Sequence, residues 1–378
     1  MLALSPSRVL TASGFEKERC LLIENGRIAG LLPSASCPAA AEAEVLQGDL
    51  VPGFIDLQVN GGGGVLFNDE PTIEGIETIG RAHRRFGTTG FLATLISDEL
   101  EIIEKAMRAV EGALRKGVPG ILGIHIEGPF INSEMRGIHD QRKIRRIDEA
   151  AVELLSSLEA GVTLVTLAPE LASSPIVESL AERGVIVAAG HTAASYEEMR
   201  LALDAGATGF THLFNSMSQL SARAPGAVGA ALDSRAWCGI IVDGFHVHPA
   251  PLRIALAAKG ADDLVLVTDA MPMVGSDKTQ FMLGDRLIRV ENGRCVAEDG
   301  TLAGSNLNMA SAVANAVELL QIDLEIAIAM ATRNPARAVR LEEAVGTIRP
   351  GLRADLALLN SEGKVVRTWI SGVEQRES

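Results

Sequence analysis

Eight short apolar runs recur along the middle of the chain and alternate with amphipathic segments. Continuous apolar runs of this length are typical of parallel strands that are buried on both faces, and the amphipathic segments would be the helices that connect them. Eight such units over about 220 residues predict an α/β fold, a (β/α)8 TIM barrel. The runs are Gly53–Val59, Thr88–Leu95, Gly120–Ile126, Gly161–Leu167, Gly184–Ala189, Ala207–Thr211, Cys238–Val242 and Leu264–Val267.

A doubly wound open sheet is the alternative architecture. It would require a phosphate-binding glycine motif after an early strand. The chain has no G-x-G-x-x-G, and the contiguous glycines of Gly61–Gly64 are not followed by a Lys-Ser/Thr pair. The sequence therefore favours the barrel.

Both ends of the chain have short strand-like pieces separated by turns. Residues 1–50 and 346–378 are expected to form one small β-sandwich domain, which lies beside a barrel of residues 51–345. Within the barrel segment, residues 280–301 predict a β-hairpin insertion with a tight Asn292-Gly293 turn.

Composition limits the partners of the chain. A net charge of −14 argues against non-specific binding to nucleic acid or to an anionic membrane surface. No apolar run approaches 18 residues, so no membrane span is expected. The first residues lack the features of a signal peptide, which predicts a cytoplasmic protein. The four cysteines form no C-x-x-C pair and are expected to be free thiols.

Polar residues follow most of the predicted strands where the strands end. In a barrel these carboxyl ends meet at one face, where active sites lie. Burying so many polar groups at one end of the barrel without partners would cost free energy, so they are expected to form a functional site. They are Gln58 and Asn60 at the end of the first run, Glu127 after the third, His191 after the fifth, His212 after the sixth, Asp243, His246 and His248 after the seventh, and Asp269 after the eighth.

Two imidazoles and one carboxylate from this set fit a catalytic metal site. Such a ligand set leaves a coordination position open for water, whose pKa falls to about 7 in zinc enzymes. Asp269 on the final strand would exchange the proton of that water. His83 is expected to be structural, and His125 and His248 are expected to support the site or to pack.

Several motifs resemble the amidohydrolase superfamily and, within it, the N-acetylglucosamine-6-phosphate deacetylases. They span most of the chain and occur in the order found in that family. The motifs are Val51–Asp56, His125–Pro129, Gly190–Thr192, Thr211–Asn215, Val242–His246, Val267–Ala270, Asn334–Arg337 and Gly346–Leu356.

The resemblance implies a homodimer with one divalent metal per subunit, Zn²⁺ in the first place and Fe²⁺ or another divalent ion as the alternative. Glu127, His191 and His212 would hold the metal. Asp269 would be the acid/base, and His139 would polarise the acetamide carbonyl. The substrate pocket would comprise Ile138, His139, Asn215, Ser216, Arg223, Asp243, His246, Leu302, Ala303 and Gly304, with some phosphate contacts from the neighbouring subunit.

One departure from the superfamily concerns the first strand. Many amidohydrolases have His-x-His there and bind a second metal, whereas this chain has Gln58 and Asn60. Amides are poor ligands beside imidazoles, so these are expected to be vestigial second-metal positions.

The reaction that the resemblance implies is hydrolysis of N-acetyl-D-glucosamine 6-phosphate to glucosamine 6-phosphate and acetate. N-acetylgalactosamine 6-phosphate is the alternative substrate. Another amidohydrolase reaction and a non-catalytic scaffold are the more distant alternatives.

Overall fold

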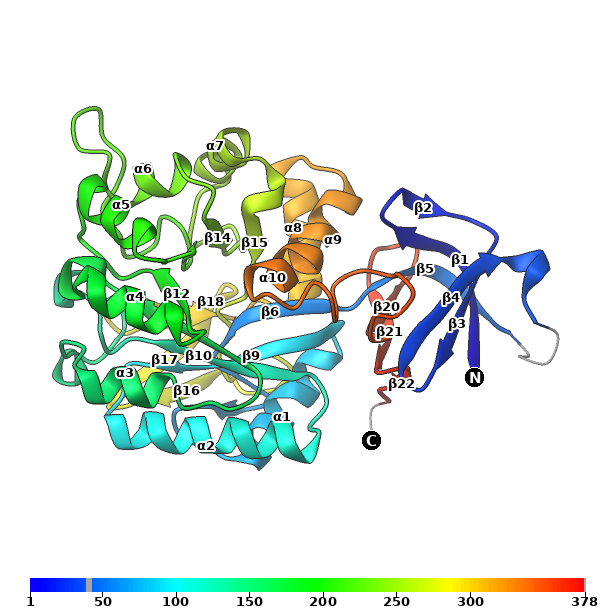
Figure 1. Ribbon diagram of the computed structural model, residues 1–378, viewed down its shortest axis with the longest axis horizontal. Helices are drawn as coiled ribbons and strands as arrows, with labels where there is room; N and C mark the ends of the chain where they lie inside the picture. The colour runs from blue at the N-terminus through cyan, green and yellow to red at the C-terminus, as the bar shows by residue number, and fades with distance from the viewer. Residues whose placement is uncertain (39–42, 377–378) are drawn as a thin grey trace.

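The chain folds into a barrel and a small β domain that both chain ends build (Figure 1). The computed structural model describes residues 1–38 and 43–376. Strand β5 of the small domain leads directly into the first barrel strand, so the small domain adjoins the end of the barrel where that strand begins. The carboxyl ends of the barrel strands point away from it.

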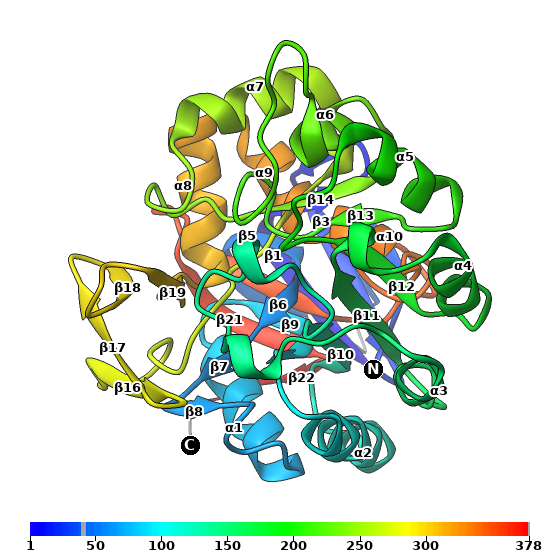
Figure 2. The same cartoon turned by 90° about the vertical axis from the view of Figure 1, so that its left-hand side faces the viewer.

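The barrel confirms the predicted (β/α)8 architecture. Its eight strands pair in parallel in chain order, and helices surround them as an outer ring (Figure 2). Each predicted apolar run contains or overlaps one strand. The strands are β6 (Phe54–Val59), β9 (Thr88–Ile96), β10 (Ile121–Glu127), β11 (Val162–Leu167), β12 (Ile186–Ala189), β13 (Gly209–Phe210), β14 (Trp237–Ile240) and β15 (Leu264–Leu266).

Ten α-helices lie in the described part of the chain. Two of them have no clear amphipathic period in the sequence: α6 is made of small residues that are nearly all buried, and α7 begins with two prolines in its first turn. The helices are α1 (Ile73–Arg84), α2 (Leu100–Lys116), α3 (Glu149–Leu155), α4 (Ser174–Glu182), α5 (Tyr196–Asp204), α6 (Gly226–Leu232), α7 (Pro249–Lys259), α8 (Met309–Leu320), α9 (Leu324–Ala331) and α10 (Arg333–Ala338).

The small domain joins the two chain ends through β5, which pairs with β1 on one side and with β20 on the other. Its core includes Leu4, Leu21, Leu50, Leu356 and Trp369. Side chains from both ends of the chain therefore share one core. The strands are β1 (Leu2–Thr11), β2 (Gly14–Glu16), β3 (Arg19–Glu24), β4 (Arg27–Pro33), β5 (Glu44–Pro52), β20 (Leu356–Leu359), β21 (Val365–Ile370) and β22 (Val373–Glu374).

The insertion after the last barrel strand is larger than the hairpin expected at residues 280–301. It is a four-stranded antiparallel sheet of β16 (Gln280–Leu283), β17 (Arg286–Glu291), β18 (Arg294–Ala297) and β19 (Leu302–Ser305). The β17–β18 turn is formed by Asn292 and Gly293, whose φ angles of 51° and 85° suit a tight hairpin. The apolar face of this sheet packs on Met271, beside the barrel.

The expectation of four free cysteines is wrong for one pair. Cys20 in β3 and Cys37 form a disulfide, with their Cα atoms 5.9 Å apart. Sequence spacing did not reveal this pair, because β3, β4 and the following turn bring the two residues together. Cys238 and Cys295 are free and buried, and burial raises the pKa of each to about 12.

Within the described residues, no helix combines the length and the apolar character needed to cross a membrane.

Helix capping gives a test of the fold. Ser195 forms a capping box at α5, in which its hydroxyl accepts from Glu198 N and the Glu198 side chain accepts from Ser195 N. We expect Ser195→Ala to lower the free energy of unfolding by about 1 kcal/mol. Ser173, at the start of α4, makes no side-chain capping bond, so Ser173→Ala is the matched control. Urea unfolding that gave equal losses for both variants would contradict the capping argument.

Candidate active site

The predicted metal ligands and the predicted acid/base residue lie together at the carboxyl end of the barrel. Glu127 is the last residue of β10, and His191, His212 and Asp269 follow β12, β13 and β15. The last three have left-handed φ angles of 48°, 32° and 53°. Non-glycine residues rarely adopt this conformation, which costs of order 1–3 kcal/mol for each residue and is concentrated at functional sites.

Glu127, His191 and His212 converge on one point. Glu127 Oε1 lies 3.3 Å from His191 Nε2 and 2.9 Å from His212 Nε2, and the two nitrogens are 3.0 Å apart. Ligand atoms in a tetrahedral zinc site lie about 3.3 Å apart, because each metal–ligand bond is about 2.0–2.1 Å long. The three side chains therefore fit a single divalent metal ion.

The hydrogen bonding of His191 supports this fit. Its Nδ1–H donates to the carbonyl of Met135 at 2.8 Å, so its Nε2 carries the lone pair that faces the cluster. A metal-binding histidine usually has such a second hydrogen bond. His212 Nδ1, by contrast, is buried and has no partner among the described residues, so no group there fixes its tautomer.

Glu127 is ionised despite its burial. Burial alone would raise the pKa of this carboxyl, but the imidazoles of His191 and His212 beside it bring it well below its usual range. Burial alone would also lower the pKa of His212, yet the hydrogen bond and the charge of Glu127 raise it. The site thus favours positive charge next to the Glu127 carboxylate.

The two amides of the first strand bind carboxylates in this structure. Gln58 Nε2 lies 3.0 Å from both oxygens of Glu127 and 3.1 Å from Asp269 Oδ1. Asn60 Nδ2 donates to the same Asp269 oxygen at 2.6 Å. The amide N–H groups therefore point at the carboxylates, where ligands to a second metal would have to present lone pairs.

Asp269 has the properties of an acid/base group. Burial and the nearby charge of Glu127 raise its pKa to about 6. A carboxyl with a pKa near the working pH can both accept and return a proton. The Gln58 amide bonds to the carboxylates of both Asp269 and Glu127, so Asp269 lies close to the proposed metal ligands.

His139 is neutral and presents a donor to the cavity. Its Nδ1 accepts from the backbone N–H of Ser97 at 3.3 Å and lies 2.7 Å from Ser97 Oγ, so the proton resides on Nε2. Burial and the charge of His191 lower its pKa to about 3. A ligating atom of His139 also lies within 4.8 Å of Glu127 and His191, but His212 makes the shorter contacts with both.

These groups line one cavity of about 250 Å³. It brings together most of the predicted substrate residues with the metal and acid/base residues. The predicted residues that line it are Asn60, Glu127, Ile138, His139, His191, His212, Asn215, Ser216, His246, Asp269, Leu302 and Gly304. It is also lined by residues that we did not predict: Ile96, Gly137, Ile241, Met271 and Thr301.

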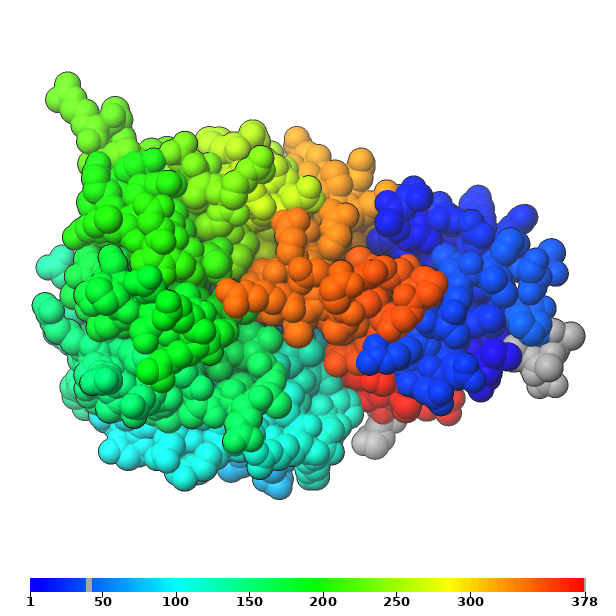
Figure 3. Space-filling view, in the orientation of Figure 1, coloured from blue at the N-terminus to red at the C-terminus, as the bar shows by residue number. Residues whose placement is uncertain are grey.

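Three predicted substrate residues lie elsewhere. Ala303 is fully buried in the core of the insertion. Asp243 does not line the cavity but holds His246, whose Nδ1 lies 2.6 Å from Asp243 Oδ2. Arg223 is exposed, in the loop that precedes α6 and projects from the barrel (Figures 1 and 3).

The other histidines have structural roles. Buried His125 contacts the hydroxyls of Thr94 and Thr166, and burial lowers its pKa to about 4. His83 contacts the carbonyl of Gly61 from α1. His248 is exposed and caps α7 by accepting from Ala250 N. It therefore has neither of the roles expected for it, which were support of the site and packing.

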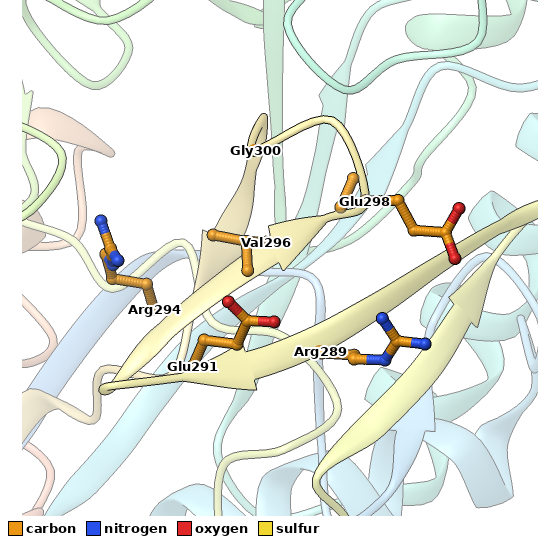
Figure 4. Close-up of a pocket in the computed structure, with 7 residues that line it drawn as sticks. Arg289, Glu291, Arg294, Val296, Glu298 and Gly300 are labelled. Carbon is orange, nitrogen blue, oxygen red and sulfur yellow. The ribbon is translucent and has the colours of Figure 1, made fainter.

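A larger hollow, of about 430 Å³, lies on β17 and β18 of the insertion (Figure 4). Its charged residues are two arginines and two glutamates, all exposed, and no histidine lines it. The smaller cavity, by contrast, is lined by buried histidines and a buried glutamate, so we place the chemistry there.

Comparison with known proteins agrees with this geometry. The chain matches the Amidohydrolase family over residues 50–374. This chain belongs to the amidohydrolase family. An N-acetylgalactosamine-6-phosphate deacetylase of Shewanella sp. (strain ANA-3) is 42% identical over 98% of this chain and 95% of that protein. An N-acetylglucosamine-6-phosphate deacetylase of Haemophilus influenzae is 35% identical over 94% of each chain.

Solved structures of amidohydrolases show the same fold. An N-acetylglucosamine-6-phosphate deacetylase from Pasteurella multocida has a TM-score of 0.96 and 33% identity, over all of both chains. A mutant deacetylase from Mycobacterium smegmatis, in complex with N-acetyl-D-glucosamine-6-phosphate, has a TM-score of 0.92 and 32% identity, covering 100% of this chain and 99% of that one.

Sequence reasoning missed residues that hold the others in place. Ser97 directly follows β9 and lies two residues after the second apolar run, so the rule that identified Glu127 could also have identified it. Glu170 follows the fourth run and accepts from Thr192 Oγ1 and Ala193 N, next to His191. Asp56 belongs to a quoted motif but was assigned no role.

Metal content tests the ligand assignment. We expect about one divalent ion per chain in the purified protein, as three protein ligands and an open position require. His212→Ala should lose most of this metal, whereas His139→Ala should keep it, because His139 presents an N–H donor and not a lone pair. Elemental analysis of the two variants shows whether His212 or His139 is the metal ligand. Metal loss only in His139→Ala, or two ions per wild-type chain, would overturn the assignment.

Proposed function

We propose that this amidohydrolase removes the acetyl group of N-acetyl-D-glucosamine 6-phosphate and releases glucosamine 6-phosphate and acetate. The proposal depends chiefly on one observation: the carboxylate–imidazole cluster, Asp269 and the neutral donor His139 line a single cavity. Metal-assisted hydrolysis of an amide needs these three functions side by side.

Each residue has a defined role in this reaction. A divalent ion held by Glu127, His191 and His212, Zn²⁺ in our proposal, would supply Lewis acidity and lower the pKa of a water molecule. Asp269 accepts a proton from the attacking water and returns it to the departing amine nitrogen. His139 donates a hydrogen bond from Nε2 to the acetamide oxygen as negative charge develops there.

The substrate phosphate needs a cation that the cavity lacks. Within the described residues, no lysine or arginine lines it, and its ionised side chains include two carboxylates. Asn215 and the backbone at Ser216 can donate hydrogen bonds there. We propose that the chain forms a homodimer in which the projecting loop of each subunit carries Arg223 to the partner's cavity, where it meets the phosphate.

The C4 epimer is the second candidate substrate. The relative with 42% identity is an N-acetylgalactosamine-6-phosphate deacetylase, and both sugars present the same acetamide and phosphate. His246, held by Asp243, lines the cavity and is a candidate for contacting the sugar hydroxyls. We propose a cytoplasmic location, where phosphorylated sugars are found.

Acetate release tests the proposed reaction. The wild type should release acetate from N-acetylglucosamine 6-phosphate faster than from N-acetylgalactosamine 6-phosphate, and slowly from the unphosphorylated sugar. Asp269→Asn cannot accept the proton, so its kcat should fall by about 10²–10⁴. No release from either phosphosugar would refute the proposed function, and a preference for the galactosamine compound would establish the second candidate.

Mixed dimers test the shared phosphate site. Arg223→Ala should raise KM for the phosphosugar and leave the activity towards the unphosphorylated sugar unchanged. Arg223→Ala and Asp269→Asn chains, each nearly inactive at low substrate, should regain activity when they are mixed through unfolding and refolding. One site of each mixed dimer then has an intact Asp269 and the partner's Arg223. Absence of this recovery, in dimers shown to be mixed, would place Arg223 outside the site. Arg235→Ala, another exposed arginine, is the control.

A further inference from the structure

The barrel has one junction that lacks a strand ladder. Neighbouring strands pair by backbone ladders around the ring from β6 to β15, but among the described residues β15 and β6 share none. The contact there is an isolated bridge between Val59 and Ala270. The N–H groups of Asn60 and Gly61 also donate to the carbonyl of Ala270, at 2.9 Å each.

Asp56 crosses this junction with its side chain. It lies in β6 and is fully buried. Its Oδ1 accepts from the backbone N–H of Thr268 and of Gln58, both at 3.2 Å, and its Oδ2 accepts from Thr268 Oγ1 at 2.5 Å. The carboxylate of Asp56 thus provides the hydrogen bonds that a ladder would otherwise provide between the first and last strands.

Thr268 is followed by the proposed acid/base, Asp269. The Asp269 carboxylate is held by Gln58 and Asn60, which lie in or just after β6. These contacts form only if the end of the last strand has the correct position relative to β6. Asp56 is the β6 side chain that binds both the backbone N–H and the hydroxyl of Thr268, next to Asp269.

We propose that Asp56 is a positioning residue: by binding Thr268 across the junction, it holds the Asp269 carboxylate against Gln58 and Asn60 in the geometry for proton transfer. This inference depends on the proposed function. Asp56 does not line the cavity, so it acts through Thr268 and not on the substrate.

The chemistry of the three hydrogen bonds explains the choice of side chain. Two backbone N–H groups need an acceptor that reaches both, because a buried donor left unpaired is destabilising. Burial raises the pKa of Asp56 to about 7, although its hydrogen bonds oppose this. An asparagine can satisfy the same groups: its oxygen accepts both N–H bonds and its NH₂ donates to Thr268 Oγ1. The Thr268 hydroxyl can then turn to the carbonyl of Gln58, 3.3 Å away.

The test compares steady-state kinetics, metal content and melting temperature of four variants. Asp56→Ala should lower kcat about 100-fold and Thr268→Val about 10-fold, with KM changed by less than about twofold, because misplacing a catalytic group by about 1 Å has such effects. Metal content should stay at the wild-type value in both. Asp56→Asn should recover kcat to within about threefold of the wild type.

Thr88→Val is the matched control. Thr88 is also a buried barrel threonine, but its hydroxyl has no partner among the described residues. Its replacement should leave kcat unchanged. A merely structural role of Asp56 would lower the melting temperature and leave kcat per folded, metal-loaded enzyme unchanged.

Several outcomes would overturn the inference. It fails if Asp56→Ala and Thr268→Val retain wild-type kcat, or if their losses follow metal content or KM. It also fails if Asp56→Asn loses as much as Asp56→Ala. If Asp56→Ala does not fold, Thr268→Val and Asp56→Asn decide. An inactive wild type would refute the proposed function instead, and a crystal structure of Thr268→Val would then test whether Asp269 leaves Gln58 and Asn60.

Discussion

The buried carboxylate of Glu127 is the group around which the site is organised. Burial of a charge costs several kcal/mol unless other groups compensate for it. Here His191, His212 and Gln58 all reach this carboxylate from separate strands. Because parallel barrel strands end at one face, these side chains can meet although they lie far apart in the chain. A divalent cation bound by these side chains would compensate the charge further and would suit the close approach of the two imidazoles.

The two carboxylates of the site have different environments and hence different ionisation. The neighbouring imidazoles keep the pKa of Glu127 well below its usual range, which suits a ligand. Burial and the charge of Glu127 raise the pKa of Asp269 to about 6, which suits an acid/base group. Such a separation of pKa values between neighbouring acids allows one site to bind a cation and to transfer a proton. Gln58 contacts both carboxylates and so links the two functions.

Substrate recognition places a different demand on the chain. A net charge of −14 and a cavity with two carboxylates both oppose a phosphate. The described residues that line the cavity include no lysine or arginine, so we propose that the cation comes from outside it. An exposed arginine on a projecting loop would meet this need if a second subunit received it. The proposed dimer and the proposed substrate thus depend on each other.

The sequence by itself determined the barrel, because buried parallel strands and amphipathic helices have different hydrophobic periods. It also placed Glu127, His191, His212 and Asp269 among the polar residues at strand ends, which are costly unless they serve a site. The resemblance to the amidohydrolases then selected the metal ligands from that set. It could not find the Cys20–Cys37 disulfide, since spacing does not reveal which turns bring two cysteines together. It also gave no role to Asp56 or Ser97. Their functions depend on partners 212 and 42 residues away. Only the tertiary structure decided these pairings: closing the ring places Asp56 of the first strand beside Thr268, and the loop after β10 brings His139 to Ser97.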